Sequence, residues 1–470
     1  MLPIPSSPRG RILTTSIAAF GSLTSGLFAG PVINEIHYNN DINTVANEFV
    51  EIYNPGPGEV DVSGWQLTGA IEYTIPSDNI LLENTYLVVA DLPSTIQSRY
   101  GITALGPYTG GLSGDGERVD LIDAGGVRVD RVNYDVDFPW PTAADGTGSS
   151  MELINASLDN GLGSSWRSSS TNGVLAAPTP GTTNRVSSAV AAPNIRQVTH
   201  TPKQPKDSEA TVITAKVTDP EGVSTVQLEY SLIAPGAYVP ALLAKPHSTL
   251  LSSPTTPRTQ NPAYQRRWLL APMLDDGLGN DAVANDDIYT ATVPAQPNRT
   301  LIRYRINVSD VPGESITVPY FDDESLNFAC FVYNGIPDYV AATRTAFGSP
   351  PYRHSSETLQ SLPGYHLLTT SDDYDQCVAY TRNQISSGNF DARSEFNWSG
   401  TFVYNGKVYD NIKYRLRQRN ARYSGSGKRS FRFRFNRGNF VQFHDMWGNP
   451  YPTKWRTLNS HKMDARGGAN

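Results

Sequence analysis

The sequence is poor in cysteine and has no long hydrophobic run beyond residue 29. Its 470 residues include only Cys330 and Cys377, and neither stands in a CxxC motif. A disulfide scaffold and a CxxC-type zinc or redox centre are therefore excluded, while one bridge or two buried thiols both remain open. After residue 29, no stretch reaches the roughly 18 apolar residues that a membrane-spanning helix needs. We therefore expect no transmembrane span after the N-terminal segment.

Turn-forming and aromatic residues are plentiful instead. The chain has 39 Gly, 34 Pro and 10% aromatic residues. Short hydrophobic runs between turn residues favour β-sandwiches over helix bundles. At about 150 residues per domain, the length suggests roughly three domains. We predict a mainly β protein.

The N-terminal 29 residues are typical of an export sequence. Arg9 and Arg11 precede an uncharged stretch, residues 12–29, that ends Leu27-Phe28-Ala29. A basic start, an apolar centre and small residues at the end are the parts of a cleaved signal peptide. We predict a signal peptide at residues 1–29 and a protein that is secreted or held at the cell surface.

The next part of the chain alternates apolar and polar residues, as strands do. The expected strands lie at residues 32–36, 48–53, 60–67, 86–90, 118–123 and 127–134. Strands of this spacing predict a Greek-key sandwich. Glu35, Glu48 and Glu51 fall in these strands, and alternation predicts that they face solvent rather than form a catalytic carboxylate pair.

Several motifs in this region resemble the bacterial lamin-tail domain. They are Asn34-Glu35-Ile36, the segment 48–54, Ser63-Gly64-Trp65 and the segment 151–154. The resemblance covers residues 30–185. It implies an immunoglobulin-like sandwich that binds an extracellular protein or surface polymer and has no enzymatic activity of its own.

A linker and a second sandwich are expected to follow. Residues 177–184 and 186–193 are rich in Pro, Ser, Thr and Ala and lack the apolar residues of a core. Residues 211–217, 226–230 and 300–308 then alternate as strands do. Residues 194–329 resemble another immunoglobulin or fibronectin type III sandwich, and residues 330–364 are a connecting segment.

One loop of this second region concentrates carboxylates. Its acidic residues are Asp275, Asp276, Asp281, Asp286 and Asp287, with two glycines among them. Carboxylate oxygens are the ligands that calcium requires, so the loop is a calcium-site candidate. The spacing fits no EF-hand, and acidic Asp/Gly runs are more often solvated turns whose carboxylates cap their own backbone.

The C-terminal end is strongly basic. Residues 407–470 hold 15 Lys and Arg against three Asp, a net charge of +12, although the whole chain has a net charge of -7. A basic end on an acidic body predicts that this end meets phosphate or another anionic partner.

Strand patterns organise this basic end. Asn405-Gly406 between two apolar runs predicts a tight hairpin. From Lys428 to Phe435, Phe and Arg alternate, so phenyl rings are expected on one face of a strand and guanidinium groups on the other, where they could hold phosphate. Nucleic-acid binding ranks third among the functions considered, because base stacking needs aromatic and basic side chains on the same face.

These strands resemble the start of the spore-coat protein H (CotH) family of atypical secreted kinases. The resemblance rests on residues 414–417, 424–427 and 428–435, and covers residues 365–470. It implies an incomplete α+β kinase-like domain with Lys428, Arg415 and Arg417 as phosphate-binding residues, and with ATP and Mg²⁺ bound by the complete domain. The catalytic acids are expected beyond Asn470, so no catalytic residue is assigned in this chain. The alternative is a purely adhesive surface protein with a non-catalytic C-terminal scaffold.

Overall fold

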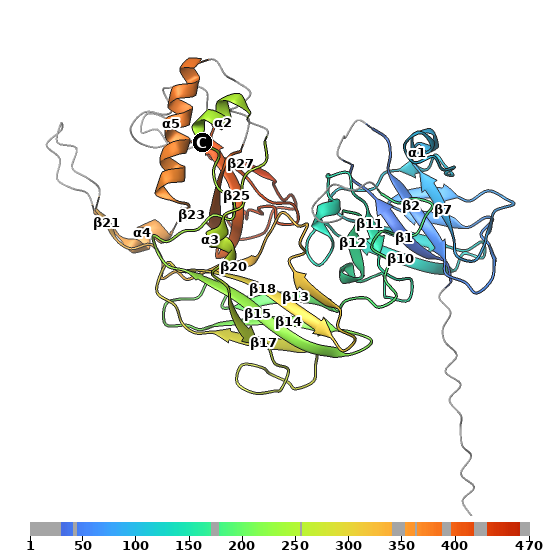
Figure 1. Ribbon diagram of the computed structural model, residues 1–470, viewed down its shortest axis with the longest axis horizontal. Helices are drawn as coiled ribbons and strands as arrows, with labels where there is room; N and C mark the ends of the chain where they lie inside the picture. Colours follow the sequence, from blue (N-terminus) through green and yellow to red (C-terminus); the bar gives the residue numbers. More distant parts are fainter. Residues whose placement is uncertain are drawn as a thin grey trace, which may run out of the picture.

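A computed structural model describes residues 30–40, 45–170, 178–253, 256–340, 353–361, 364–387, 396–417 and 430–460. The fold is mainly β, with several antiparallel sheets, one of them curled into a half-barrel, and little helix in the described residues (Figure 1). The expected signal peptide at residues 1–29 lies outside these ranges.

The first unit packs two five-stranded sheets face to face. The sheet orders are β12-β11-β1-β2-β7 and β10-β9-β4-β5-β8. One core joins both, with Ile36 and Val50 from one sheet meeting Leu121 from the other. The elements are β1 (Val32–His37), β2 (Phe49–Asn54), β3 (Val60–Asp61), β4 (Gln66–Gly69), β5 (Ile71–Thr74), β6 (Ile80–Leu81), β7 (Thr85–Ala90), α1 (Pro93–Tyr100), β8 (Thr109–Gly110), β9 (Glu117–Ile122), β10 (Arg128–Tyr134), β11 (Met151–Leu153) and β12 (Trp166–Ser168).

The expectation that the strand glutamates face solvent is wrong for two of the three. Glu35 and Glu51 do point away from the shared core, but both are fully buried. Residues 178–186 cover them, with the backbone N–H of Thr179 donating to Glu35 Oε1 at 3.0 Å. Alternation decides which face of a sheet a residue takes, but it does not say what covers that face. Part of the segment expected to be a free linker is therefore packed on the sheet.

The second unit again has two sheets around a shared core. Their orders are β13-β14-β17 and β16-β15-β18-β19, and β20 also pairs with β18. Ile213 from the first sheet and Ile306 from the second belong to the same buried cluster. The elements are β13 (Asn194–Thr201), β14 (Thr211–Thr218), β15 (Val223–Ile233), α2 (His247–Ser252), α3 (Pro262–Gln265), β16 (Leu269–Pro272), β17 (Ile288–Val293), β18 (Leu301–Asp310), β19 (Ser315–Val318) and β20 (Phe328–Phe331).

The C-terminal unit has a five-stranded antiparallel sheet in the order β23-β24-β25-β26-β27, and β21 and β22 form a separate pair. The predicted hairpin is confirmed: Asn405 and Gly406 join two strands with φ of 49° and 73°, the left-handed conformation that Asn-Gly favours. Sequence patterning did not predict α5, which packs on β24 and β25. The elements are β21 (Tyr339–Val340), β22 (Arg353–His354), α4 (Ser356–Gln360), β23 (Tyr365–Leu368), α5 (Ser371–Ser387), β24 (Trp398–Tyr404), β25 (Lys407–Leu416), β26 (Phe431–Arg434) and β27 (Thr457–Ser460).

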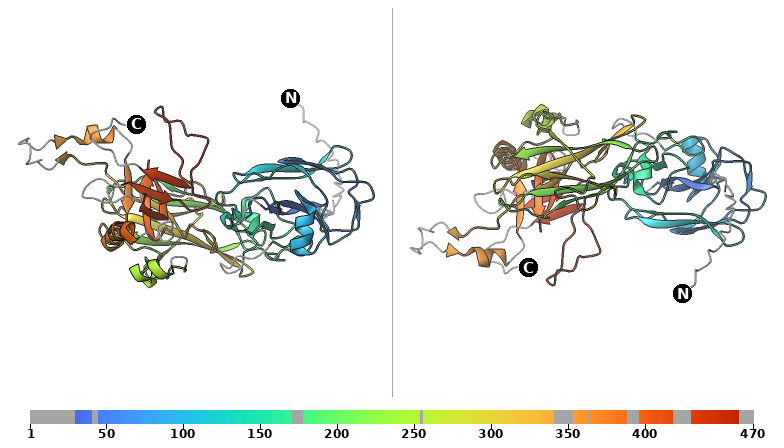
Figure 2. Two further views of the ribbon diagram at one scale, coloured as in Figure 1. Left: turned by 90° about the horizontal axis from the view of Figure 1, so that it is seen from above. Right: turned by 90° about the horizontal axis from the view of Figure 1, so that it is seen from below.

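The three units touch one another. The C-terminal sheet lies against the second unit, and the first unit stands to one side of both (Figures 1 and 2). Thr142 of the first unit donates to Asp323 of the second at 2.6 Å, and Lys454 of the third forms an ion pair with Asp137 of the first. These contacts place side chains from different units around shared sites.

The two cysteines are buried, and no disulfide joins them. Cys330 belongs to the core of the second unit, whereas Cys377 on α5 packs into the core of the C-terminal unit. The alternative of a bridge between them is therefore wrong.

Candidate anion-binding face of the C-terminal sheet

Two neighbouring strands of the C-terminal sheet carry cations directly opposite each other. Lys413 on β25 pairs with Arg434 on β26, and two residues further along Arg415 pairs with Arg432. All four side chains are half-buried. Like charges in register destabilise a sheet, so the fold keeps a costly arrangement at two successive positions.

The opposite face of the same strands is apolar, as the alternation of Phe and Arg predicts. Tyr414 and Phe433 are register neighbours between these cations and are buried in the core of the unit. The rings therefore hold the sheet to its core, and the cations lie on the other side.

Two further arginines join this surface from other segments. Arg456, just before β27, and Arg258, from the second unit, both act on the charge of Lys413. Arg258 donates from Nη1 to Ser399 Oγ at 2.6 Å, beside Lys413 in register. We call the six side chains the basic face; they are Arg258, Lys413, Arg415, Arg432, Arg434 and Arg456.

Two members of the basic face, Lys413 and Arg258, have lowered pKa values. Burial lowers the pKa of Lys413, Glu324 opposes this effect, and the charges of Arg258, Arg434 and Arg456 lower it further. Burial likewise lowers the pKa of Arg258 to about 10. The Nε atoms of Arg432 and Arg456 are buried and make no hydrogen bond to the described residues. An anion would satisfy both the charge and these donors.

One acid from the second unit, Glu324, lies beside Arg456 of the basic face. Glu324 accepts from the backbone N–H of Arg437 at 2.8 Å and from its Nη1 at 2.6 Å, and Arg456 Nη2 lies 3.5 Å from the same carboxylate. Burial alone would raise the pKa of Glu324, but the charges of Arg437 and Lys413 outweigh it and the pKa is lowered. Glu324 is therefore ionised and neutralises only part of the cluster.

An aromatic ring lies beside two arginines of the basic face. The guanidinium carbons of Arg415 and Arg432 lie 5.1 Å and 5.6 Å from the ring centroid of Phe396. Cations within about 6 Å of a ring face are attracted to it. The ring holds the two arginines side by side without cancelling their charge.

The predicted phosphate-binding residues have three different outcomes. Arg415 lies on the basic face. Arg417 is exposed just beyond β25, where its N–H donates to Ser430 O at 2.9 Å and extends the ladder with β26. Lys428 lies outside the described residues. Sequence patterning missed Arg258 and Glu324, because they come from a different unit and nothing in their local sequence marks them.

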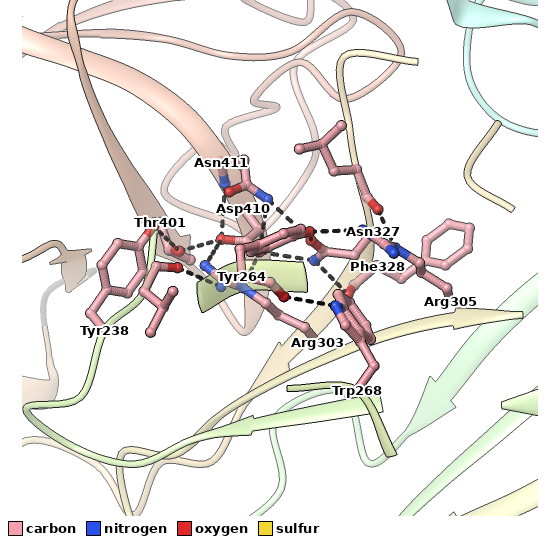
Figure 3. A network of polar contacts seen from close by, with 12 residues as sticks. Tyr238, Tyr264, Trp268, Arg303, Arg305, Asn327, Phe328, Thr401, Asp410 and Asn411 are labelled. Carbon is pink, nitrogen blue, oxygen red and sulfur yellow. Dashed lines mark hydrogen bonds and ion pairs between the residues drawn. The ribbon is translucent and has the colours of Figure 1, made fainter. Parts of the chain in front are cut away.

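A buried ion pair fixes the position of this sheet (Figure 3). Arg303 on β18 donates from Nε and Nη2 to the two carboxylate oxygens of Asp410 on β25, at 2.7 Å and 3.1 Å. Both side chains are almost completely buried. A bidentate pair of this kind fixes orientation as well as distance, so β25 is held in one position relative to β18 of the neighbouring sheet.

Polar neighbours complete the hydrogen bonding of this pair (Figure 3). Asp410 also accepts from Thr401 Oγ1 at 2.5 Å and from Asn327 Nδ2 at 2.9 Å. The remaining guanidinium nitrogen of Arg303, Nη1, donates to Val239 O at 2.7 Å. Burial would raise the pKa of Asp410, but Arg303 and these donors lower it, so the pair is ionic.

The acidic loop between β16 and β17 brings only part of its carboxylates together. Asp275, Asp281 and Asp286 each offer an oxygen within 4.8 Å of the others. Asp276 and Asp287 are not in this group. The Asp275 carboxylate accepts from the backbone N–H of Asp286 and Asp287 at 3.2 Å and 2.9 Å, and Asp281 accepts from Gly277 N at 2.6 Å. These bonds are those of turns that cap their own backbone, and calcium would need six or more oxygen ligands here.

Among the described residues, no helix has both the length and the apolar character required to cross a bilayer.

Comparison with known proteins identifies one part of the chain. Residues 28–135 match the family model of the lamin tail domain. No curated protein matches the chain. Nothing in these comparisons supports the CotH domain expected at residues 365–470.

Matches to solved structures are loose. A purple acid phosphatase from yellow lupin (Lupinus luteus) seeds is similar at 12% identity over 71% of this chain and 48% of that chain, with a TM-score of 0.19. The alpha-2-macroglobulin of E. coli in its native conformation is similar at 8% identity over 91% of this chain and 32% of that chain, with a TM-score of 0.18. The chain spans about half the length of the phosphatase, and TM-scores of this size carry no argument about fold or activity. The chain is thus a multidomain, β-rich protein that carries a lamin tail domain at residues 28–135.

Proposed function

We propose that the basic face binds the phosphate groups of a nucleotide, and that the C-terminal unit is the first part of a CotH-like phosphotransferase domain. The observation that carries this proposal is the pair of like-charged register neighbours, Lys413 with Arg434 and Arg415 with Arg432. Such repulsion costs stability, and an anion bound between the strands would offset it. That the anion is a nucleotide is inferred from the resemblance of residues 414–435 to the CotH family.

The remaining units have a binding role in this proposal. The lamin tail domain and the second two-sheet unit are taken as immunoglobulin-like modules that contact an extracellular protein or a surface polymer. The protein is secreted or held at the cell surface, with residues 1–29 as its signal peptide. ATP and Mg²⁺ belong to the complete phosphotransferase domain.

The test is nucleotide binding by the purified chain. Calorimetric titration with ATP, with and without Mg²⁺, is expected to show binding that weakens with added salt, because the contacts are ionic. An Arg415→Ala/Arg432→Ala double variant should lose at least about tenfold in affinity, since each charged hydrogen bond contributes about 1.5 kcal/mol or more. Arg128→Ala, an exposed arginine on β10, is the matched control.

A second variant pair addresses the residue that the resemblance singles out. Lys428→Ala should weaken ATP binding, whereas Lys407→Ala, beside the Asn405-Gly406 turn, should leave it unchanged. If the parent chain binds no ATP, or if the double arginine variant binds it as tightly as the parent, the proposed function is wrong and the adhesive scaffold is the better account.

A further inference from the structure

The first unit buries three glutamates side by side on one sheet. Glu152 on β11, Glu35 on β1 and Glu51 on β2 are register neighbours, so they form a single line across three adjacent strands. We call this line the glutamate row. All three side chains are fully buried. Like charges in register repel each other, and each ionised carboxylate removed from water adds a larger cost.

A covering segment, residues 178–186, lies across the glutamate row and donates at least one backbone N–H to each member. The three hydrogen bonds run from Thr179 N to Glu35 Oε1 at 3.0 Å, from Gly181 N to Glu51 Oε2 at 2.5 Å and from Val186 N to Glu152 Oε2 at 3.2 Å. Glu152 Oε1 also accepts from the hydroxyl of Thr179 at 2.7 Å. The covering segment therefore depends on the glutamates for its backbone hydrogen bonding.

A pair of amides fixes the register of this contact. Asn34 on β1 donates to Asn184 Oδ1 at 2.9 Å, and Asn184 donates back to Asn34 Oδ1 at 3.1 Å. Asn34 also donates to Glu51 Oε1 at 2.8 Å, and Asn184 to Leu153 O at 2.8 Å. The amide pair carries no charge, so it gives the covering segment one position without opposing the charge of the row.

The row has too few cations around it to be fully ionised. Among the described residues, the charged and titratable groups that face it are Arg185 of the covering segment, Arg167 on β12, His37 on β1, Tyr86 on β7 and Tyr100 at the end of α1. Arg167 donates to the backbone oxygens of Ser164 and Trp166, and its guanidinium carbon lies 4.3 Å from the ring centroid of Tyr320. Arg185 is exposed. Two cations at the edges of the row do not balance three buried carboxylates.

One oxygen of the row has no donor among the described residues. Glu35 Oε1 accepts from Ser150 Oγ and from Thr179 N, but the buried Oε2 accepts from nothing that the structure describes. A buried carboxylate oxygen without a donor is costly when charged. It is the natural place for a proton.

Burial and the repulsion between neighbouring carboxylates both favour protonation of the glutamate row. Burial raises the pKa of Glu51 to about 8, and the hydrogen bonds from Gly181 and Asn34 only partly oppose this effect. Burial raises the pKa of Glu35 well above its usual value, and the charges of Glu51 and Glu152 raise it further. Burial also raises the pKa of Glu152. A carboxyl whose pKa rises on burial is held protonated by the closed structure, so the closed state is favoured at low pH and weakens as pH rises through about 8.

We propose that the glutamate row and the covering segment form a proton-dependent latch: the segment is closed while the row holds its protons and detaches from the sheet when they are lost. Opening exposes a row of three carboxylates and releases residues 178–186 from the sheet. The latch belongs to the first unit and does not depend on nucleotide binding by the C-terminal sheet.

Hydrogen–deuterium exchange of the whole chain tests the latch. Protection factors, corrected for the intrinsic effect of pH, are compared at about pH 6 and about pH 9.5 for the covering segment and for β2 and β9. We expect protection of the covering segment to fall by at least about tenfold, the effect of one pKa unit, while the strands stay protected. If protection of the segment does not change with pH, or if strands and segment lose it together, the proposal is wrong.

Neutral variants identify the groups responsible. Glutamine resembles the protonated glutamate and cannot ionise, so Glu51→Gln and, separately, Glu152→Gln should reduce the pH dependence of the segment. Glu48→Gln is the matched control, because Glu48 accepts from Leu112 N and the Tyr108 hydroxyl rather than from the covering segment. If both row variants keep the pH dependence of the parent, the proposal fails. If neither variant folds, the exchange profile of the parent chain decides it alone.

Discussion

Arg303 on β18 and Asp410 on β25 meet in a buried bidentate ion pair that joins the second unit to the C-terminal sheet. The two residues are 107 positions apart. Their contact determines where β25 lies, and therefore where Lys413 and Arg415 of the same strand point. The position of the basic face thus depends on an ion pair between its own sheet and the second unit.

Breaking this pair should be costly. Asp410→Asn leaves Arg303 buried without its counter-ion, and we expect it to lower the free energy of unfolding by about 3–5 kcal/mol. Urea denaturation measures the change. Replacing both residues, as Arg303→Met/Asp410→Leu, should cost less than the single change, because no unpaired charge remains.

The exposed ion pair of Arg353 with Asp338 provides the comparison. Asp338→Asn should lower the free energy of unfolding far less than Asp410→Asn does, since exposed pairs contribute little. Equal losses for Asp338→Asn and Asp410→Asn would contradict the anchoring role of the buried pair.

Removing the acid of the basic face should strengthen anion binding. Glu324→Gln deletes a carboxylate that acts on both Arg456 and Lys413, and we expect the affinity for ATP or pyrophosphate to rise roughly tenfold, since one nearby unit charge changes an ionic contact by 1 kcal/mol or more. Calorimetric titration measures this change. Glu357→Gln, an exposed glutamate on α4, should have no effect. A lower affinity in Glu324→Gln would mean that the acid positions the cations rather than competes for them.

The pH dependence of stability should also report on Glu324. Its pKa is lowered in the folded protein, so its ionised form stabilises the fold above the ordinary pKa of a glutamate, and this contribution is lost as pH falls through the folded pKa. The difference in unfolding temperature between the parent and Glu324→Gln should therefore be present at neutral pH and disappear in acid. A difference that grows in acid would have the wrong sign.

Much of this arrangement can be predicted from the sequence, but part of it cannot. Alternation located the strands around Val50 and Ile306, and the Asn405-Gly406 pair predicted its hairpin, because these features depend on residues close together in the chain. Glu324 and Arg258 reach the basic face only through the packing of two units. The burial of Glu35 could not be foreseen either, since it depends on a segment about 145 residues away that carries few apolar side chains.

The acidic loop should stabilise the protein without calcium. Asp275 accepts from the backbone N–H groups of Asp286 and Asp287, so Asp275→Ala should cost about 1–2 kcal/mol through the loss of these turn contacts. Differential scanning calorimetry in excess calcium and in chelator should give the same unfolding temperature. A higher temperature with calcium would instead assign the ion to Asp275, Asp281 and Asp286, since a ligand that binds only the native state raises stability.

The first unit should fold by itself. Its core is formed entirely by residues between Val32 and Trp166. Its contacts with the second unit, such as the hydrogen bond between Thr142 and Asp323 and the packing of Phe138 on Tyr320 and Phe328, lie outside this core. A fragment of residues 30–193 should therefore unfold cooperatively and give a β-type circular dichroism spectrum. A helical or unstructured spectrum would contradict this expectation.

The basic face belongs to more than one unit, and this limits how its parts could be exchanged between proteins. Glu324 and Arg258 lie in the second unit, while Arg437 donates from Nη2 to Gly146 O of the first at 2.7 Å. A C-terminal sheet moved alone into another protein would lose Arg303, the partner that orients β25, and would keep its facing cations without their acid. Gene rearrangements that preserve the site must therefore carry the second and third units together, so these two units form one heritable module even though each has its own sheets.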